Sequence, residues 1–109
     1  MAVRSLIEFK VREGEEAAFE RAYLAHGLLH RAVSAPGFLS GDFLRPAPES
    51  TSFWATALWR SRDDYSAWQS AYTSVFSRHA LTEIGQFLSA APQGFALEVA
   101  ANVQGDAPS

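Results

Sequence analysis

Four short segments of the chain show the alternation of apolar residues, or the apolar and aromatic composition bounded by turn residues, that is typical of β-strands. These segments are residues 3–11, 38–45, 51–59 and 95–103. The third, TSFWATALW, is apolar on both faces, so both of its faces need cover.

Helical spacing, with apolar residues at steps of three and four, fills the intervals between these strands. A first helix is predicted over about residues 15–34, ended by Ala35-Pro36-Gly37. A second begins at Ser61, which with Asp64 resembles a capping box. If that helix is unbroken, five residues share one side of it, and a further short helix follows over about residues 81–88; the five are Tyr65, Trp68, Tyr72, Phe76 and His79.

The predicted order of elements is β-α-β-β-α-β, an α+β fold of the ferredoxin-like kind in which helices cover one face of an antiparallel sheet. The opposite face is left open. Trp54 and Leu58 fall on it, and a large exposed apolar patch usually marks an interface. Face-to-face association into a homodimer is the simplest cover.

Composition is that of one compact domain over residues 1–109, with a frayed tail from about residue 104. The formal net charge is -3 without a basic cluster, which argues against nucleic acid as a partner. There is no cysteine, no signal-peptide pattern and no apolar stretch long enough to span a membrane. We therefore expect a cytoplasmic protein that does not bind membranes.

Two stretches, PGFLSGDFLRP and SFWATALWRSRDDYSAW, resemble the antibiotic biosynthesis monooxygenase superfamily. The similarity rests on a Pro-Gly-Phe at residues 36–38 that opens the second strand, a Trp-x-Ser at residues 59–61, and Tyr65 and Trp68 in the helix that follows. The resemblance implies a dimeric α+β barrel. Its small members from aromatic polyketide pathways oxidise anthrones or naphthacenones to quinones without a metal or a bound cofactor.

The same resemblance implies an oxygenase that acts on O₂ and a polycyclic aromatic, polyketide-type substrate in secondary metabolism. It carries over Trp59, Tyr65 and, by position along the helix, His79. Ala55 stands where the quinone-forming members carry an Asn. No cofactor is expected, with reduced flavin or haem left open.

Histidine suits a proton acceptor because its ordinary pKa lies close to neutral pH. The candidates are His26, His30 and His79. His26 and His30 are one turn apart on the apolar stripe of the first helix and should point toward the sheet. Three histidines could also bind a metal, but without an acidic partner we expect none.

The middle of the chain is rich in aromatic residues, which stack on flat polycyclic ligands or simply form a core. Small residues between Phe53 and Trp59 leave space for such a ligand, and Arg45 could stabilise an enolate oxygen. The predicted substrate-binding residues are Tyr23, Phe43, Arg45, Phe53, Ala55, Trp59, Trp68, Tyr72 and Phe76.

Other functions fit the same fold and the same set of aromatic residues. Trp68, Phe76 and His79 resemble the haem-degrading helix of the superfamily with altered spacing, although Ile7 occupies the approximate place of the Asn that those members use. Related barrels cyclise polyketones. A dimeric ligand-binding module without catalysis would use the aromatic residues as core alone.

Overall fold

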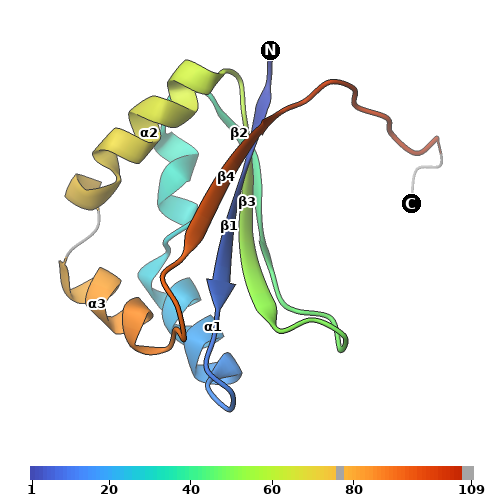
Figure 1. The fold of residues 1–109 in the computed structure, drawn as a ribbon. Helices are drawn as coiled ribbons and strands as arrows, with labels where there is room; N and C mark the ends of the chain where they lie inside the picture. Colours follow the sequence, from blue (N-terminus) through green and yellow to red (C-terminus); the bar gives the residue numbers. More distant parts are fainter. Residues whose placement is uncertain (76–77, 107–109) are drawn as a thin grey trace.

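The computed structural model describes residues 1–75 and 78–106, without the side chains of residues 72–75. The described residues form four strands, three α-helices and one short 3-10 helix, arranged as a sheet with the helices on one side (Figure 1). The elements are β1 (Val3–Lys10), α1 (Glu16–His26), η1 (His30–Ser34), β2 (Phe38–Leu44), β3 (Ser52–Trp59), α2 (Arg62–Val75), α3 (Arg78–Gln86) and β4 (Gln93–Glu98).

The strands lie in the order β2-β3-β1-β4, and every neighbouring pair is antiparallel. This confirms the predicted α+β ferredoxin-like fold. The structure places β3 inside the sheet, between β1 and β2. Side chains alternate across the sheet. Phe9, Phe53 and Trp59 point to the helices, whereas Trp54 and Leu58 lie on the face that no helix covers.

An aromatic core fastens α1 to the sheet. Phe19 is completely buried, and its ring lies within 5.0–6.4 Å of the rings of five other aromatic residues. Tilted and edge-on ring pairs of this kind add to the stabilisation that comes from burial alone. The partners of Phe19 are Phe9, Tyr23, Phe43, Phe53 and Phe87.

The prediction of one helix over residues 15–34 was wrong. Helix α1 ends at His26, because Gly27 adopts a left-handed conformation with φ 63° and its N–H donates to the carbonyl of Leu24. The chain then turns through η1 before β2 begins. The left-handed cap changes the direction of the side chains that follow it, so His26 and His30 do not share a helical stripe.

The second predicted helix is also divided. Its start is confirmed: the backbone N–H of Asp64 donates to Ser61 Oγ at 3.2 Å, and the Ser61 hydroxyl donates to the Asp64 carboxylate at 2.9 Å. Helix α2 ends at Val75, and His79 belongs to α3. His79 therefore does not continue the stripe that begins with Tyr65 and Trp68.

The last strand is shorter than expected, ending at Glu98 instead of Val103. Beyond it, residues 100–106 have no regular secondary structure and extend away from the sheet, on the side opposite the helices (Figure 1). Within the described residues, no helix is long and apolar enough to cross a membrane.

Candidate functional site

A cavity of about 300 Å³ lies between the sheet and the helical layer. The sheet contributes its helix-facing side, and α1, α2 and the segment around η1 contribute the walls. Its lining is mostly apolar and, among the described residues, contains no charged side chain and no histidine. The lining residues are Ser5, Ile7, Phe9, Tyr23, Leu28, Leu29, Ala32, Ala55, Thr56, Ala57, Trp59, Tyr65, Trp68, Gln69, Pro92 and Gly94.

The cavity exists because the strands carry small residues at its floor. In the sheet register Ser5 of β1 lies between Ala57 of β3 and Ala96 of β4. Two residues further along β1, Ile7 lies between Ala55 of β3 and Gly94 of β4. Protein interiors are normally packed without such voids, so a row of small side chains under large aromatic ones leaves a shaped space.

The cavity continues into a hollow between α2 and β4. This shallower hollow is lined by residues of these two elements and shares Tyr65, Gln69 and Gly94 with the cavity. Strand β4 is exposed along its whole length, since it is an edge strand that no helix covers. A ligand can therefore approach along this edge.

Trp59 forms the inner wall. It is 1% exposed, and its indole Nε1–H donates to Ser5 Oγ at 3.1 Å across the sheet. Its ring packs near those of Tyr65 and Trp68, with centroids 5.8 and 6.2 Å away. The three rings form a continuous aromatic surface beside the cavity.

Tyr65 is a titratable side chain of this lining whose environment shifts its pKa. Burial raises that pKa above the ordinary value, because an apolar environment disfavours the charged phenolate. The hydroxyl therefore stays protonated at neutral pH, and it can donate a hydrogen bond to a ligand oxygen.

The Pro-Gly-Phe turn positions the helix that carries Tyr65. Gly37 has a φ of 82°, and its carbonyl accepts a hydrogen bond from the N–H of Arg60 at 2.8 Å. A Cβ at Gly37 would collide with the side chain of Asp64, which interacts with Ser61 at the start of α2. The absence of a side chain at Gly37 thus lets the turn lie against the first turn of α2, one residue before Tyr65.

Several predicted ligand contacts come together at the cavity, and others do not. Tyr23, Ala55, Trp59, Tyr65 and Trp68 all line it. Among the remaining predicted residues, Phe43 and Phe53 pack in the core behind it, with Phe43 stacked on Tyr23 at 4.1 Å. Phe76 lies outside the described residues, as does the side chain of Tyr72.

Arg45 lies on the surface, away from the cavity. Its guanidinium donates two hydrogen bonds of 2.7 Å to the carboxylate of Glu20, which lower the pKa of Glu20 and raise that of Arg45. Arg45 is therefore not among the residues of the described cavity lining.

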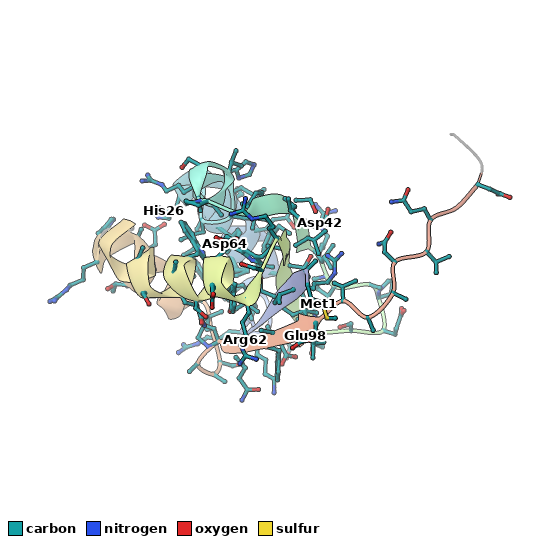
Figure 2. The ribbon with its side chains drawn as sticks, turned by 90° about the horizontal axis from the view of Figure 1, so that it is seen from above. Met1, His26, Asp42, Arg62, Asp64 and Glu98 are labelled. Carbon is teal, nitrogen blue, oxygen red and sulfur yellow. The ribbon has the colours of Figure 1, made fainter. Side chains whose placement is uncertain are left out.

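The three histidines lie outside the described cavity lining. His26 and His79 both approach one carboxylate oxygen of Glu83, at 3.4 and 3.5 Å, where α1 meets α3. Figure 2 shows His26 on the helical side of the molecule, and His30 is exposed on η1. No group of three potential ligands suited to a metal ion is found among the described residues.

Residues 2–74 match the model of the family described as antibiotic biosynthesis monooxygenase. The chain belongs to the antibiotic biosynthesis monooxygenase family. This match covers β1 through α2, and so includes most of the described cavity lining. A comparison with curated proteins gave no significant match.

Solved structures of family members share the fold. A mutant of SnoaB, a cofactor-independent oxygenase from Streptomyces nogalater, is 18% identical, with a TM-score of 0.71 over 94% of this chain and 96% of that one. The heme-degrader MhuD from Mycobacterium tuberculosis is 21% identical, with a TM-score of 0.67 over 94% and 99%. An antibiotic biosynthesis monooxygenase homologue from Nitrosomonas europaea is 18% identical, with a TM-score of 0.64 over 88% of each chain.

Sequence reasoning missed several members of the lining in this family member. Ser5, Ile7, Leu28 and Ala32 were not among the predicted ligand contacts, yet all of them line the cavity. Ser5 could have been found from its place on the apolar side of β1, between Val3 and Ile7, where a hydroxyl needs a partner.

Proposed function

We propose that this protein is an oxygenase that oxidises a flat, uncharged polycyclic aromatic substrate of the polyketide type without a bound cofactor. Membership of the monooxygenase family supports the class of reaction. The observation that carries the substrate class is the described cavity lining, which is aromatic, free of charged side chains and built on a floor of small residues. Flat aromatic ligands are stabilised by such walls.

The reaction balances without an external reductant if the substrate supplies every electron. An acidic ring CH₂ loses a proton, the resulting carbanion transfers an electron to O₂, and the two radicals combine into a peroxide anion that takes up the proton to give a hydroperoxide. Loss of water from this hydroperoxide leaves a C=O group. One oxygen atom enters the substrate, and the other leaves as water.

The protein's contribution to this sequence is to favour the anion and to exclude water. Hydrogen-bond donors directed at the developing enolate oxygen stabilise it more in a dry cavity than in water. Tyr65 meets this requirement, because it remains protonated beside the cavity. The role of His26, His30 or His79 as the proton acceptor remains a prediction that variants must test.

The test is oxygen consumption with anthrone, followed by the absorbance of the quinone product, in metal-free buffer with and without reduced flavin. We expect turnover without flavin, and a large loss of kcat in Tyr65→Phe. His26→Ala, His30→Ala and His79→Ala then identify any histidine that acts. Binding of the tricycle without oxygen consumption would reject the oxygenase and favour a cyclase or a binding module.

Haem does not fit the described part of the cavity. Iron in haem proteins is held by His, Cys, Met or Tyr. The described lining offers only Tyr23 and Tyr65, and the raised pKa of Tyr65 opposes binding as a phenolate. No basic side chain of this lining faces a propionate. A haem titration that gives a saturable Soret shift at one equivalent would overturn this conclusion.

We also propose that the open face of the sheet is the interface of a homodimer. Leu97 and Phe95 of β4 are 60% and 45% exposed, and Trp54 packs beside Phe95 at 6.5 Å. Apolar side chains gathered on one sheet face are typical of an interface. The described helices leave this face uncovered (Figure 1).

Analytical ultracentrifugation tests the homodimer. Leu97→Glu should convert a dimer into monomers, because it places a charge in the interface. Val33→Glu is the matched control, since Val33 is 67% exposed on η1 and away from this face. A monomeric wild-type protein would reject the proposal.

The cytoplasmic location of the protein, which the sequence led us to expect, also stays a prediction.

A further inference from the structure

One hydrogen bond crosses the floor of the cavity. The Trp59 indole N–H donates to Ser5 Oγ at 3.1 Å, and both residues are buried, with exposed fractions of 1% and 5%. An indole nitrogen carries one proton and accepts nothing. Once Trp59 has donated to Ser5, it has no polar group left for a ligand and can contact one only through its ring.

Ser5 is left with a hydroxyl proton to donate. A serine hydroxyl donates once and accepts twice, and the bond from Trp59 uses only one acceptor position. Within the described part of the chain, the Ser5 hydroxyl forms no other hydrogen bond. A buried donor without an acceptor costs free energy, so a ligand that supplies an acceptor gains by satisfying it.

The surroundings of Ser5 leave that proton accessible to a ligand. Its neighbours across the sheet are Ala57 and Ala96, which are too short to cover it. Ser5 lines the cavity itself. Thr56, the other hydroxyl on the strands of the lining, pairs with Leu6 and so extends from the opposite face of the sheet. Ser5 therefore provides the side-chain hydroxyl on the helix-facing floor.

We propose that Ser5 is a specificity-determining residue, whose hydroxyl donates to a carbonyl or phenolate oxygen of the aromatic substrate while Trp59 donates to Ser5 from behind. Hydrogen bonds in a chain polarise one another, so the bond from Trp59 strengthens the donation by Ser5. The substrate class is thereby narrowed to flat ring systems with an oxygen on the edge that reaches the sheet. This inference rests on the proposed function only in taking the ligand to be aromatic. It does not require that the protein oxidise that ligand.

A matched pair of ligands separates recognition of the oxygen from the stacking of the rings. Anthraquinone and anthracene are both flat tricycles, and only anthraquinone carries carbonyl oxygens. Binding is measured by quenching of tryptophan fluorescence in the full-length protein. We expect the wild type to prefer anthraquinone, and Ser5→Ala to lose about 3- to 10-fold of that preference while its affinity for anthracene is unchanged.

Two variants control for a merely structural effect. Ser5→Thr keeps the hydroxyl and should keep the preference. Ser52→Ala removes another buried strand serine, whose hydroxyl donates to Glu8 at 2.7 Å on the opposite face, and it should also keep the preference. In the wild type, the indole N–H resonance of Trp59 should shift when anthraquinone binds and shift less with anthracene.

The outcomes for Ser5 and for the oxygenase are distinguishable. Oxidation of anthrone together with an unchanged ligand preference in Ser5→Ala would overturn the role of Ser5 and leave the oxygenase standing. Loss of the preference without any oxidation would support Ser5 and reject the oxygenase. A wild type that binds anthraquinone no more tightly than anthracene would overturn the role of Ser5, whatever the variants do.

Discussion

Replacing Gly37 with alanine tests how the turn before β2 holds the cavity wall in place. Gly37 has a φ of 82°, where an L-residue with a Cβ is strained by about 1–2 kcal/mol. The added Cβ would also collide with Asp64 and force its carboxylate away from Ser61. Loss of such a helix cap costs about 1 kcal/mol, so we expect Gly37→Ala to lower the free energy of unfolding by about 2–3 kcal/mol.

Gly14→Ala is the matched control. Gly14 has almost the same φ, 86°, but nothing lies within 4 Å of a Cβ placed there. This variant should therefore lose only the backbone term, about 1–2 kcal/mol. In a thermal melt followed by circular dichroism, Tm should fall in both variants, and by about 4–8 °C more in Gly37→Ala than in Gly14→Ala, because only Gly37→Ala also loses about 1 kcal/mol of the helix cap.

The reasoning further predicts that the damage at Gly37 spreads to the cavity, because Tyr65 follows Asp64 directly. Gly37→Ala should weaken binding of a tricyclic ligand at a temperature where the variant is still folded, and Gly14→Ala should not. Equal losses of Tm in the two variants would show that the contact with Asp64 contributes nothing. That result would refute the proposed role of the turn in positioning α2.

Three further predictions concern the core, the cavity and the surface. Phe19→Ala should lower the free energy of unfolding by about 3–5 kcal/mol in urea titrations, because Phe19 is completely buried among five aromatic rings; a loss below 1 kcal/mol would contradict that packing. If the Tyr65 hydroxyl acts as a donor, kcat should not fall with phenol ionisation until the pH exceeds 10. Because burial raises this pKa, the stabilising effect of the protonated group is present below about pH 10 and is lost as the pH rises through the folded-state pKa; a fall of kcat near neutral pH that Tyr65→Phe abolishes would contradict this. Arg45→Ala should leave anthrone turnover nearly unchanged, because Arg45 pairs with Glu20 on the surface, and a large loss of kcat would restore the predicted contact with the substrate.

The fold was predictable because its signals are local and agree with one another. Alternation of apolar residues in the first segment, and apolar or aromatic runs bounded by turn residues in the others, predicted all four strands, and Ser61 with Asp64 marked the start of α2. The breaks in the helices were harder to see. Gly27 lies inside a stripe that keeps helical spacing on both sides, and only its left-handed backbone ends α1 there.

The candidate site was predictable only in part, for a related reason. Residue type indicated the aromatic wall, and Tyr23, Trp59, Tyr65 and Trp68 do line the cavity. The direction in which a polar side chain points depends on where its helix ends. The spacing of apolar residues along the sequence does not reveal those ends. The break at Gly27 and the end of α2 therefore displaced the histidines from the arrangement expected for them.

The structural relatives show why the lining carries more information than the fold. One is a cofactor-independent oxygenase and another is a heme-degrader, and both cover nearly the whole of this chain. The shared backbone therefore leaves the reaction open, and the side chains on the floor and walls must decide it. In this chain they offer three neighbouring aromatic rings, hydroxyl groups that include those of Ser5 and Tyr65, and no charge among the described residues. Such a lining selects against ligands that bring their own charge, because an ion would lose its hydration without gaining a partner. This agrees with the proposed substrate, a neutral ring system whose charge first develops during the reaction, on an oxygen to which a hydroxyl of the lining could donate.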